Sequence, residues 1–155
     1  VRIIEDVLEF VRISDLHMNE LLLDDVISSS IEGLDIPSSV KIERTGESIH
    51  VLCDSKKLEA VFINILTNAM DAIEKNGTIR IKTLVTSKNI VIQFVDSGLG
   101  VPPGDELRIF DPMFTTKSYG SGLGLTISKM IVEQHGGKLV YGSSPSTFSV
   151  FLPKT

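Results

Sequence analysis

Apolar residues recur at spacings of three and four in several stretches of the chain, and this period predicts amphipathic helices. The expected helices span 1–11, 22–31, 54–75 and 121–134. Asp54 is suited to cap the long third helix, and Asn76-Gly77 forms its stop. The first pattern begins at Val1 without a cap, which favours the end of a longer helix over a complete one.

Other stretches alternate apolar and polar residues, which predicts β-strands. The expected strands span 40–45, 48–53, 78–86, 89–95, 138–142 and 147–152. Gly46 separates the first two, so we expect them to form a hairpin. Residues 14–19 have the character of a linker, and a short helix is expected around Glu106 in a loop-rich region. Because strands and helices do not strictly alternate, the pattern predicts an α/β fold. We expect a two-layer α/β sandwich with helices on one face of a mixed, mostly antiparallel sheet.

The composition fits one globular domain of 155 residues, with 42% hydrophobic and 23% charged residues. A net charge of −5 argues against a broad basic surface for nucleic acid or acidic membranes. Cys53 is the only cysteine, so no internal disulfide can form, which suits a reducing compartment. The sequence contains no run of about 18 apolar residues, the length that a helix needs to span a bilayer. The start within a periodic pattern indicates a fragment of a larger protein.

Glycines gather in the segment 110–125, which reads F-D-P-M-F-T-T-K-S-Y-G-S-G-L-G-L and continues into the last predicted helix. Bare backbone N–H groups can approach an anion, and the helix dipole favours negative charge at that end. Lys117 adds a positive charge just upstream of Gly120, Gly122 and Gly124. A phosphate site is therefore predicted here, although glycines also serve simple turns.

The long predicted helix carries a polar stripe beside its apolar face. Asn64, Asn68, Asp71 and Lys75 follow one another at spacings of four, three and four, so they stack on one side. A carboxamide offers an oxygen to a hard cation and N–H donors to a phosphate. Asparagine is a poor choice for a merely solvated helix face, since it costs roughly 0.5 kcal/mol against good helix formers. The alternative interpretation of this stripe, a solvated helix face with an Asp71–Lys75 ion pair, stays open.

A carboxylate follows the apolar strand expected at 89–95. Asp96 stands at the end of this strand, with Gly98 and Gly100 behind it. The carboxylate can accept the exocyclic N–H of a base, and the glycines leave room for the ring. An ordinary turn after a strand is the alternative.

The order of these elements is more specific than any one of them. N-x-x-x-N-A on a helix, D-S-G-L-G after a strand, F-D-P-M-F-T-T-K and then G-S-G-L-G-L resemble the ATP-binding domain of sensor histidine kinases. Gyrase, the large heat-shock chaperone ATPases and MutL share this fold. The resemblance covers about residues 15–153. It implies an α/β sandwich that binds ATP and Mg²⁺ between the helices and the sheet, under a short flexible lid. It also implies a catalytic ATP-binding domain at 14–155, with 1–13 as the remnant of a dimerisation helix.

The resemblance implies a role for each matching residue. Asn68 would hold the Mg²⁺ that bridges the phosphates, and Asn64 would lie beside them. Asp96 would take the adenine amino group, while Gly98 and Gly100 would shape that pocket.

Further matches belong to the lid and the phosphate loop. Phe110 and Phe114 would anchor the lid, although core packing accounts for them equally well. Thr147 would back up the adenine contact. The residues expected around the phosphates are Thr116, Lys117, Gly120, Gly122, the backbone of Leu123, and Gly124.

Two positions depart from the family patterns. Histidine kinases often carry a basic residue three positions after the second asparagine, where this chain has Asp71. We expect Lys117 to supply the positive charge instead, with Lys75 as a second candidate. Gyrase-type ATPases activate water with a glutamate four residues before the Mg²⁺ asparagine. That position is Asn64, whose carboxamide cannot act as a general base, so we expect little intrinsic ATP hydrolysis.

None of the three histidines fits the phosphoacceptor motif of the family, in which Glu or Asp follows the histidine. His17 precedes Met18, His50 precedes Val51, and His135 precedes Gly136. His135 is expected at a helix end, as a dipole partner or a surface residue. No catalytic residue is therefore assigned in this chain.

The resemblance also implies partners. The γ-phosphate would pass to a histidine in the parent's own dimerisation and histidine phosphotransfer domain, and later to the receiver domain of a response regulator. The domain is expected to be cytoplasmic and monomeric, and the parent a homodimer. Membrane attachment of the parent stays open.

Two other functions stay in view. One is an ATP-hydrolysing domain of the gyrase or heat-shock chaperone type, which Asn64 disfavours. The other is a non-catalytic interaction module with a vestigial nucleotide pocket, which the intact Asp96, Asn68 and glycines disfavour.

Overall fold

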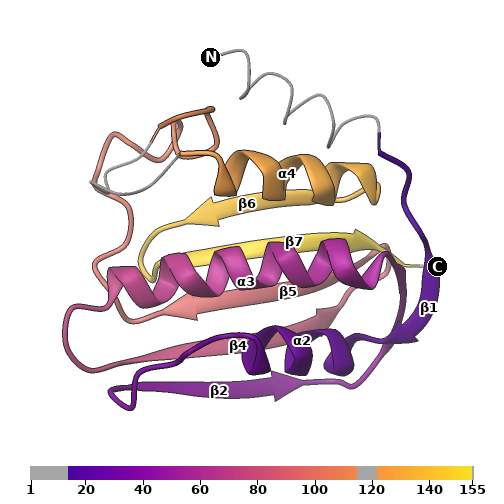
Figure 1. Cartoon of the computed structure of the whole chain (residues 1–155), viewed down its shortest axis with the longest axis horizontal. Coiled ribbons are helices and arrows are strands. Elements are labelled where there is room, and N and C mark those ends of the chain that lie inside the picture. Colours follow the sequence, from indigo (N-terminus) through magenta and orange to yellow (C-terminus); the bar gives the residue numbers. More distant parts are fainter. Residues whose placement is uncertain (1–13, 115–121, 155) are drawn as a thin grey trace.

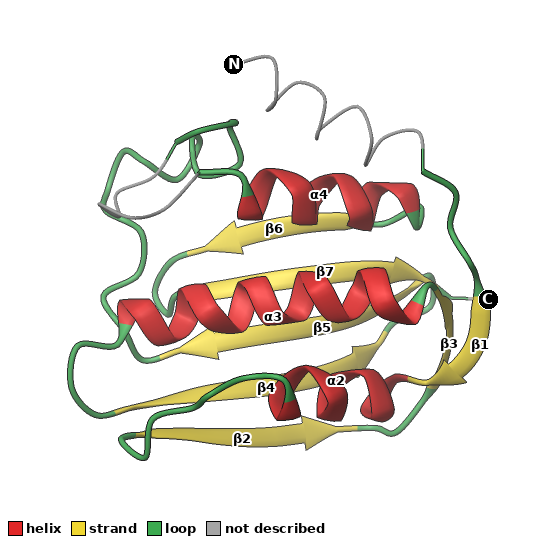
Figure 2. Cartoon of the chain, in the orientation of Figure 1, coloured by secondary structure: helices red, strands yellow, loops and turns green. Residues whose placement is uncertain are grey.

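A computed structural model describes residues 14–114 and 122–154 (Figure 1). Among these residues, three helices and a five-stranded sheet form two layers. The helices lie on one face of the sheet (Figure 2), which confirms the predicted two-layer α/β sandwich. The helices are α2 (Leu23–Glu32), α3 (Ser55–Ala72) and α4 (Gly124–Gln134). The helix expected at 1–11, and with it the dimerisation remnant at 1–13, lies outside the described residues. No helix within the described ranges is long and apolar enough to cross a membrane.

The main sheet has the strand order β2-β4-β5-β7-β6. Its strands are β2 (Val40–Gly46), β4 (Gly77–Val85), β5 (Asn89–Asp96), β7 (Thr147–Pro153) and β6 (Lys138–Gly142). β2 runs parallel to β4, and the other neighbours pair antiparallel. The prediction of a mixed, mostly antiparallel sheet is therefore confirmed.

The predicted hairpin between the first two strands is wrong. β3 (His50–Cys53) leaves the main sheet and pairs antiparallel with β1 (Asn19–Leu22), a strand that begins in the expected linker. Gly46 is not the turn of a hairpin, because it is the last residue of β2 and pairs with Thr83 of β4. It has φ +114°, and a Cβ there would collide with the Thr83 carbonyl. The alternating pattern identifies a strand but does not identify its partner.

The core lies between α3 and the sheet. The predicted apolar face of α3 is buried, and Phe62 packs against Phe94 of β5 with ring centroids 5.2 Å apart. Burial of each such side chain contributes about 1.5–3 kcal/mol. The predicted N-cap is confirmed, since the Asp54 carboxylate accepts from the Lys57 backbone N–H at 3.2 Å. α3 ends at Ala72, three residues before the predicted end.

His135 connects the end of α4 to the start of α3. It is buried, and its Nε2 accepts from the Asp54 backbone N–H at 3.0 Å. Its Nδ1 lies 2.8 Å from the Ile131 carbonyl oxygen, so Nδ1 carries the proton. The expected contact with the helix end is thus confirmed, and the expected surface position is wrong.

Candidate functional site

Asp96 ends β5 and is a buried residue, with 4% of its surface exposed. Oδ1 accepts from the Gly98 backbone N–H and Oδ2 accepts from the Ser146 hydroxyl, both at 2.9 Å. Burial raises the pKa of Asp96, and these two hydrogen bonds offset part of that rise because they favour the charged form. The structure therefore holds a buried carboxylate in one orientation, with lone pairs left to accept further hydrogen bonds.

The loop after Asp96 lies directly on the end of α3. The Leu99 N–H donates to the Ala72 carbonyl oxygen at 3.3 Å. A Cβ on Gly98 would come within 2.6 Å of the Ala72 carbonyl carbon, so only glycine permits this approach. Gly98 therefore allows the loop after Asp96 to pack directly against α3, the helix that carries Asn64 and Asn68.

Asn64 joins α3 to the start of α4. Its Nδ2 donates to the buried Ser128 hydroxyl at 3.2 Å. Its Oδ1 occupies the space in which a Cβ of Gly124 would lie. Gly124, the first residue of α4, has no side chain and therefore lies directly against the Asn64 carboxamide. Both lie at a helix N-terminus, where backbone N–H groups favour anions. Asn68 is half-buried four residues further along α3, on the same side as Asn64.

The two ends of the predicted lid lie together. The Met113 N–H donates to the Gly122 carbonyl oxygen at 2.9 Å. Gly122 has φ +72°, and a Cβ there would collide with the Met113 backbone. Residues 115–121 between them, which include the predicted Thr116, Lys117 and Gly120, lie outside the described residues. Leu123 is the N-cap of α4.

The two predicted lid anchors pack at this base. Phe110 and Phe114 are half-buried against the core. The Phe110 carbonyl accepts from the Thr126 hydroxyl of α4 at 2.8 Å, and the Arg108 guanidinium lies 4.5 Å from the Phe114 ring centroid. The short helix expected around Glu106 is wrong, because residues 102–111 form consecutive turns in which Arg108 N–H donates to the Asp105 carbonyl. Core packing and anchoring of the lid base are thus compatible roles.

The hydroxyl on Asp96 comes from Ser146, which the sequence reasoning did not select. The Thr147 hydroxyl donates instead to the Pro145 carbonyl at 2.9 Å, so its predicted support of the adenine contact stays a prediction. Tyr141 was also missed, and it donates to Ser146 at 3.2 Å. Neither residue has a spacing signal, because Ser146 reaches Asp96, and Tyr141 reaches Ser146, only through the pairing of β5, β6 and β7.

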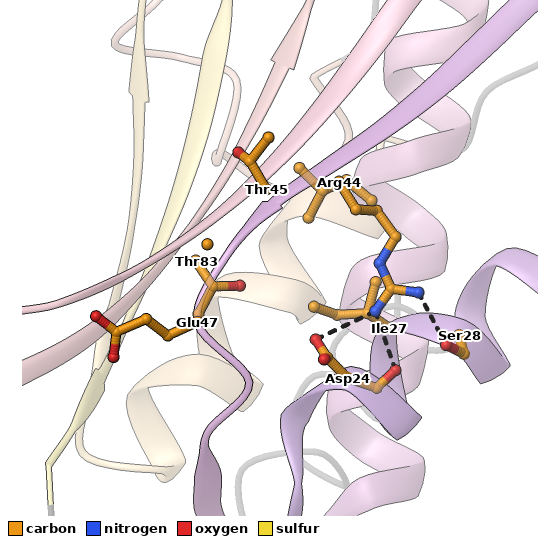
Figure 3. Close-up of a pocket in the computed structure, with 9 residues that line it drawn as sticks. Asp24, Ile27, Ser28, Arg44, Thr45, Glu47 and Thr83 are labelled. Atoms are coloured by element: carbon orange, nitrogen blue, oxygen red, sulfur yellow. Dashed lines mark hydrogen bonds and ion pairs between the residues drawn. The ribbon is translucent and has the colours of Figure 1, made fainter.

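A separate cavity of about 320 Å³ lies between α2 and the ends of β2 and β4 (Figure 3). Within it, the Arg44 guanidinium donates to the Ser28 hydroxyl at 2.9 Å and to Asp24 Oδ1 at 3.2 Å. No predicted site residue lines this cavity. Because the Arg44 charge is paired with Asp24, we assign no ligand to it.

Comparisons with known proteins agree with this geometry. A family model described as histidine kinase-, DNA gyrase B- and HSP90-like ATPase matches residues 53–155. The sensor histidine kinase ZraS of Salmonella typhimurium is 32% identical over 161 residues, covering 98% of this chain and 35% of ZraS. The histidine-protein kinase AtoS of Escherichia coli is 33% identical over 161 residues, covering 98% of this chain and 26% of AtoS.

The solved structures give the same picture. The catalytic domain of histidine kinase ThkA, in a nucleotide-free form, superimposes with a TM-score of 0.79 at 28% identity. The match covers 90% of this chain and 99% of that domain. The chain spans about a third or less of the length of the curated relatives, whereas it has the size of an isolated catalytic domain.

Proposed function

This chain belongs to the histidine kinase-, DNA gyrase B- and HSP90-like ATPase family, and we propose that it is the ATP-binding catalytic domain of a two-component sensor histidine kinase. The observation that carries the proposal is the arrangement around α3. One end of this helix contacts the loop of a buried carboxylate through Ala72, and Asn64 contacts the glycine that begins α4. A nucleotide bound along α3 would have its base at the first contact and its phosphates at the second.

The aspartate end fits adenine. Both protein partners of the Asp96 carboxylate are donors, so its oxygens act only as acceptors. An ionised carboxylate has about four lone-pair sites, and two of them stay available for an exocyclic amino group. A purine with a 6-oxo group would place an acceptor against this carboxylate and would be disfavoured.

The glycine end fits phosphate and Mg²⁺. The bare N-terminus of α4 can approach an anion closely, and the carboxamide oxygen of Asn68 is a hard ligand suited to Mg²⁺. The described residues contain no group of three His, Cys, Asp or Glu side chains that could hold a metal. Mg²⁺ commonly binds through few protein ligands together with substrate phosphates, which suits this site. When bound, it would neutralise charge on the phosphates.

The chemistry that follows is positional. The domain would hold ATP with the γ-phosphate exposed at the start of α4, in position for an acceptor. A histidine on the parent's dimerisation domain would attack the γ-phosphorus in line, and ADP would leave. The phosphoryl group would then pass to an aspartate of a response regulator. The parent would act as a homodimer.

Hydrolysis of ATP is the second candidate function. A hydrolysing relative would need a general base at position 64. Asn64 has no ionisable group, and its Nδ2 donates to Ser128. We therefore expect slow release of phosphate by this chain alone.

Titration calorimetry with ATP, with and without Mg²⁺, tests the binding. We expect Mg²⁺ to strengthen ATP binding, and Asn68→Ala to remove that gain. Asn19→Ala is the matched control, because Asn19 is an exposed asparagine on β1. Absence of binding at millimolar ATP would instead support an interaction module with a vestigial pocket.

A further inference from the structure

A line of hydrogen bonds leads from the loop after β5 to the Asp96 carboxylate. The Val101 backbone N–H donates to the Tyr141 hydroxyl at 3.0 Å. The Tyr141 hydroxyl donates to Ser146 Oγ at 3.2 Å, and Ser146 Oγ donates to Asp96 Oδ2 at 2.9 Å. These groups come from β6, from the connection between β6 and β7, and from the two sides of the aspartate loop.

Both ends of this line fix its direction. The Val101 N–H can only donate, and an ionised carboxylate can only accept. Each hydroxyl has a single proton, so Ser146 gives its proton to Asp96 and receives that of Tyr141. Every proton in the line therefore points towards Asp96.

The packing around the Tyr141 hydroxyl indicates that its position is built into the fold. The Tyr141 ring packs on Phe148 of β7 with centroids 4.9 Å apart. Gly100, at φ +73°, leaves the space beside the hydroxyl open, since a Cβ there would lie 2.8 Å from the Tyr141 oxygen and 3.2 Å from Ser146 Cβ. Gly100 therefore makes room for the hydroxyls.

We propose that Tyr141 is a positioning residue that, through its hydrogen bond to Ser146, orients the Asp96 carboxylate for a purine 6-amino group. The inference rests on the proposed function, because it assigns a residue that tunes the base contact of that site. Ser146 holds Oδ2 while the Gly98 N–H holds Oδ1, so the carboxylate cannot rotate without losing both bonds. Because the Tyr141 hydroxyl donates to Ser146 Oγ, the Ser146 hydroxyl is left to donate to the carboxylate. The Tyr141 hydroxyl also accepts from the Val101 N–H, which connects the loop after β5 to the same hydrogen bonds.

The test compares two nucleotides that differ only at the 6-amino group. Dissociation constants are measured with Mg²⁺ for ATP and for purine riboside 5′-triphosphate, which lacks this group. Loss of an oriented, charge-assisted hydrogen bond of about 1.5 kcal/mol changes the affinity ratio of the two nucleotides roughly tenfold. We expect Ser146→Ala to lower the preference for ATP by about that factor, and Tyr141→Phe to lower it about threefold.

Two further variants separate positioning from folding. Ser146→Thr keeps a hydroxyl and should restore the preference for ATP. Ser149→Ala removes a hydroxyl from β7 at a position paired with Gln93, away from the Asp96 end of β5, and should leave the preference unchanged. Circular dichroism confirms that each variant is folded.

Three outcomes are distinguishable. A reduced ratio in Ser146→Ala and Tyr141→Phe supports the proposal. If Tyr141→Phe keeps the wild-type ratio, even with weaker binding of both nucleotides, Tyr141 has only a structural role and the proposal is overturned, whatever the result for Ser146→Ala. If the wild-type chain binds neither nucleotide, the proposed function itself fails, and the inference fails with it.

Discussion

Replacement of Gly124 by alanine should weaken nucleotide binding while leaving the fold almost unchanged. Gly124 is the first residue of α4, and its missing side chain leaves space for Asn64 Oδ1. A Cβ at this position would also lie 3.0 Å from Asn64 Cγ and 3.1 Å from Asn64 Nδ2. The neighbour is the end of a side chain, so Asn64 can rotate away without moving either helix.

The free-energy terms for folding nearly cancel. Rotation of Asn64 breaks its hydrogen bond to Ser128, which costs about 1 kcal/mol. Alanine in place of glycine stabilises a helix by at most about 1 kcal/mol. We therefore expect the free energy of unfolding to change by less than about 1 kcal/mol. Nucleotide affinity has no compensating term, because the rotated Asn64 no longer lies beside the proposed phosphate position. A loss of about 1.4 kcal/mol of binding free energy corresponds to a tenfold weaker affinity.

Gly98→Ala is the contrasting variant. Its Cβ would meet the Ala72 carbonyl, which is backbone of α3 and cannot rotate away. This variant should therefore lose both stability and affinity. Urea unfolding and ATP calorimetry on the two variants provide the assay. Equal loss of stability in both variants, or full ATP affinity in Gly124→Ala, would refute the reasoning.

Three other variants test particular contacts. His135→Ala leaves the buried Asp54 N–H without its acceptor, while the Ile131 carbonyl keeps the backbone N–H of residue 135 as a donor. Urea unfolding should therefore show a loss of about 2 kcal/mol, and a loss below about 1 kcal/mol would contradict that account. Burial raises the pKa of Asp96, so ATP affinity should fall on acidification from a higher pH than for an ordinary aspartate, whereas Asp96→Asn should bind weakly without this dependence. The raised pKa means that the folded state holds this proton more tightly than the unfolded state, so the contribution of Asp96 to stability should rise as the pH falls through that pKa, as thermal unfolding would show. Lys117→Ala should weaken ATP binding in calorimetry, and unchanged affinity would remove the role predicted for it.

The sequence predicts the long helix and the antiparallel pair of β4 and β5 well, because their signals are local. The apolar period of α3 and its Asp54 cap act within the helix itself. The turn between β4 and β5 is short, so the two strands meet directly. Partners of β2 and β3 depend instead on distant segments. The parallel pairing of β2 with β4 and the pairing of β3 with β1 have no local signature.

The same distinction holds at the site. Asp96, Asn64 and Gly124 stand in recognisable motifs, and the structure shows the protein contacts of each, whereas their roles towards a nucleotide stay predictions. Ser146 and Tyr141 act on Asp96 through strand pairing alone, which no spacing along the chain reveals. Both hydroxyls are ordinary residues in sequence and become informative only when the direction of their hydrogen bonds is known.

Transfer of phosphate to a histidine tests the central claim most directly. The chain is mixed with the histidine-bearing dimerisation domain of its parent protein, Mg²⁺ and ATP labelled at the γ-phosphate. We predict label on that domain, at a histidine, and none when Asn68→Ala replaces the wild-type chain. Release of labelled phosphate with no label on the dimerisation domain would contradict the account and identify the chain as a hydrolysing ATPase.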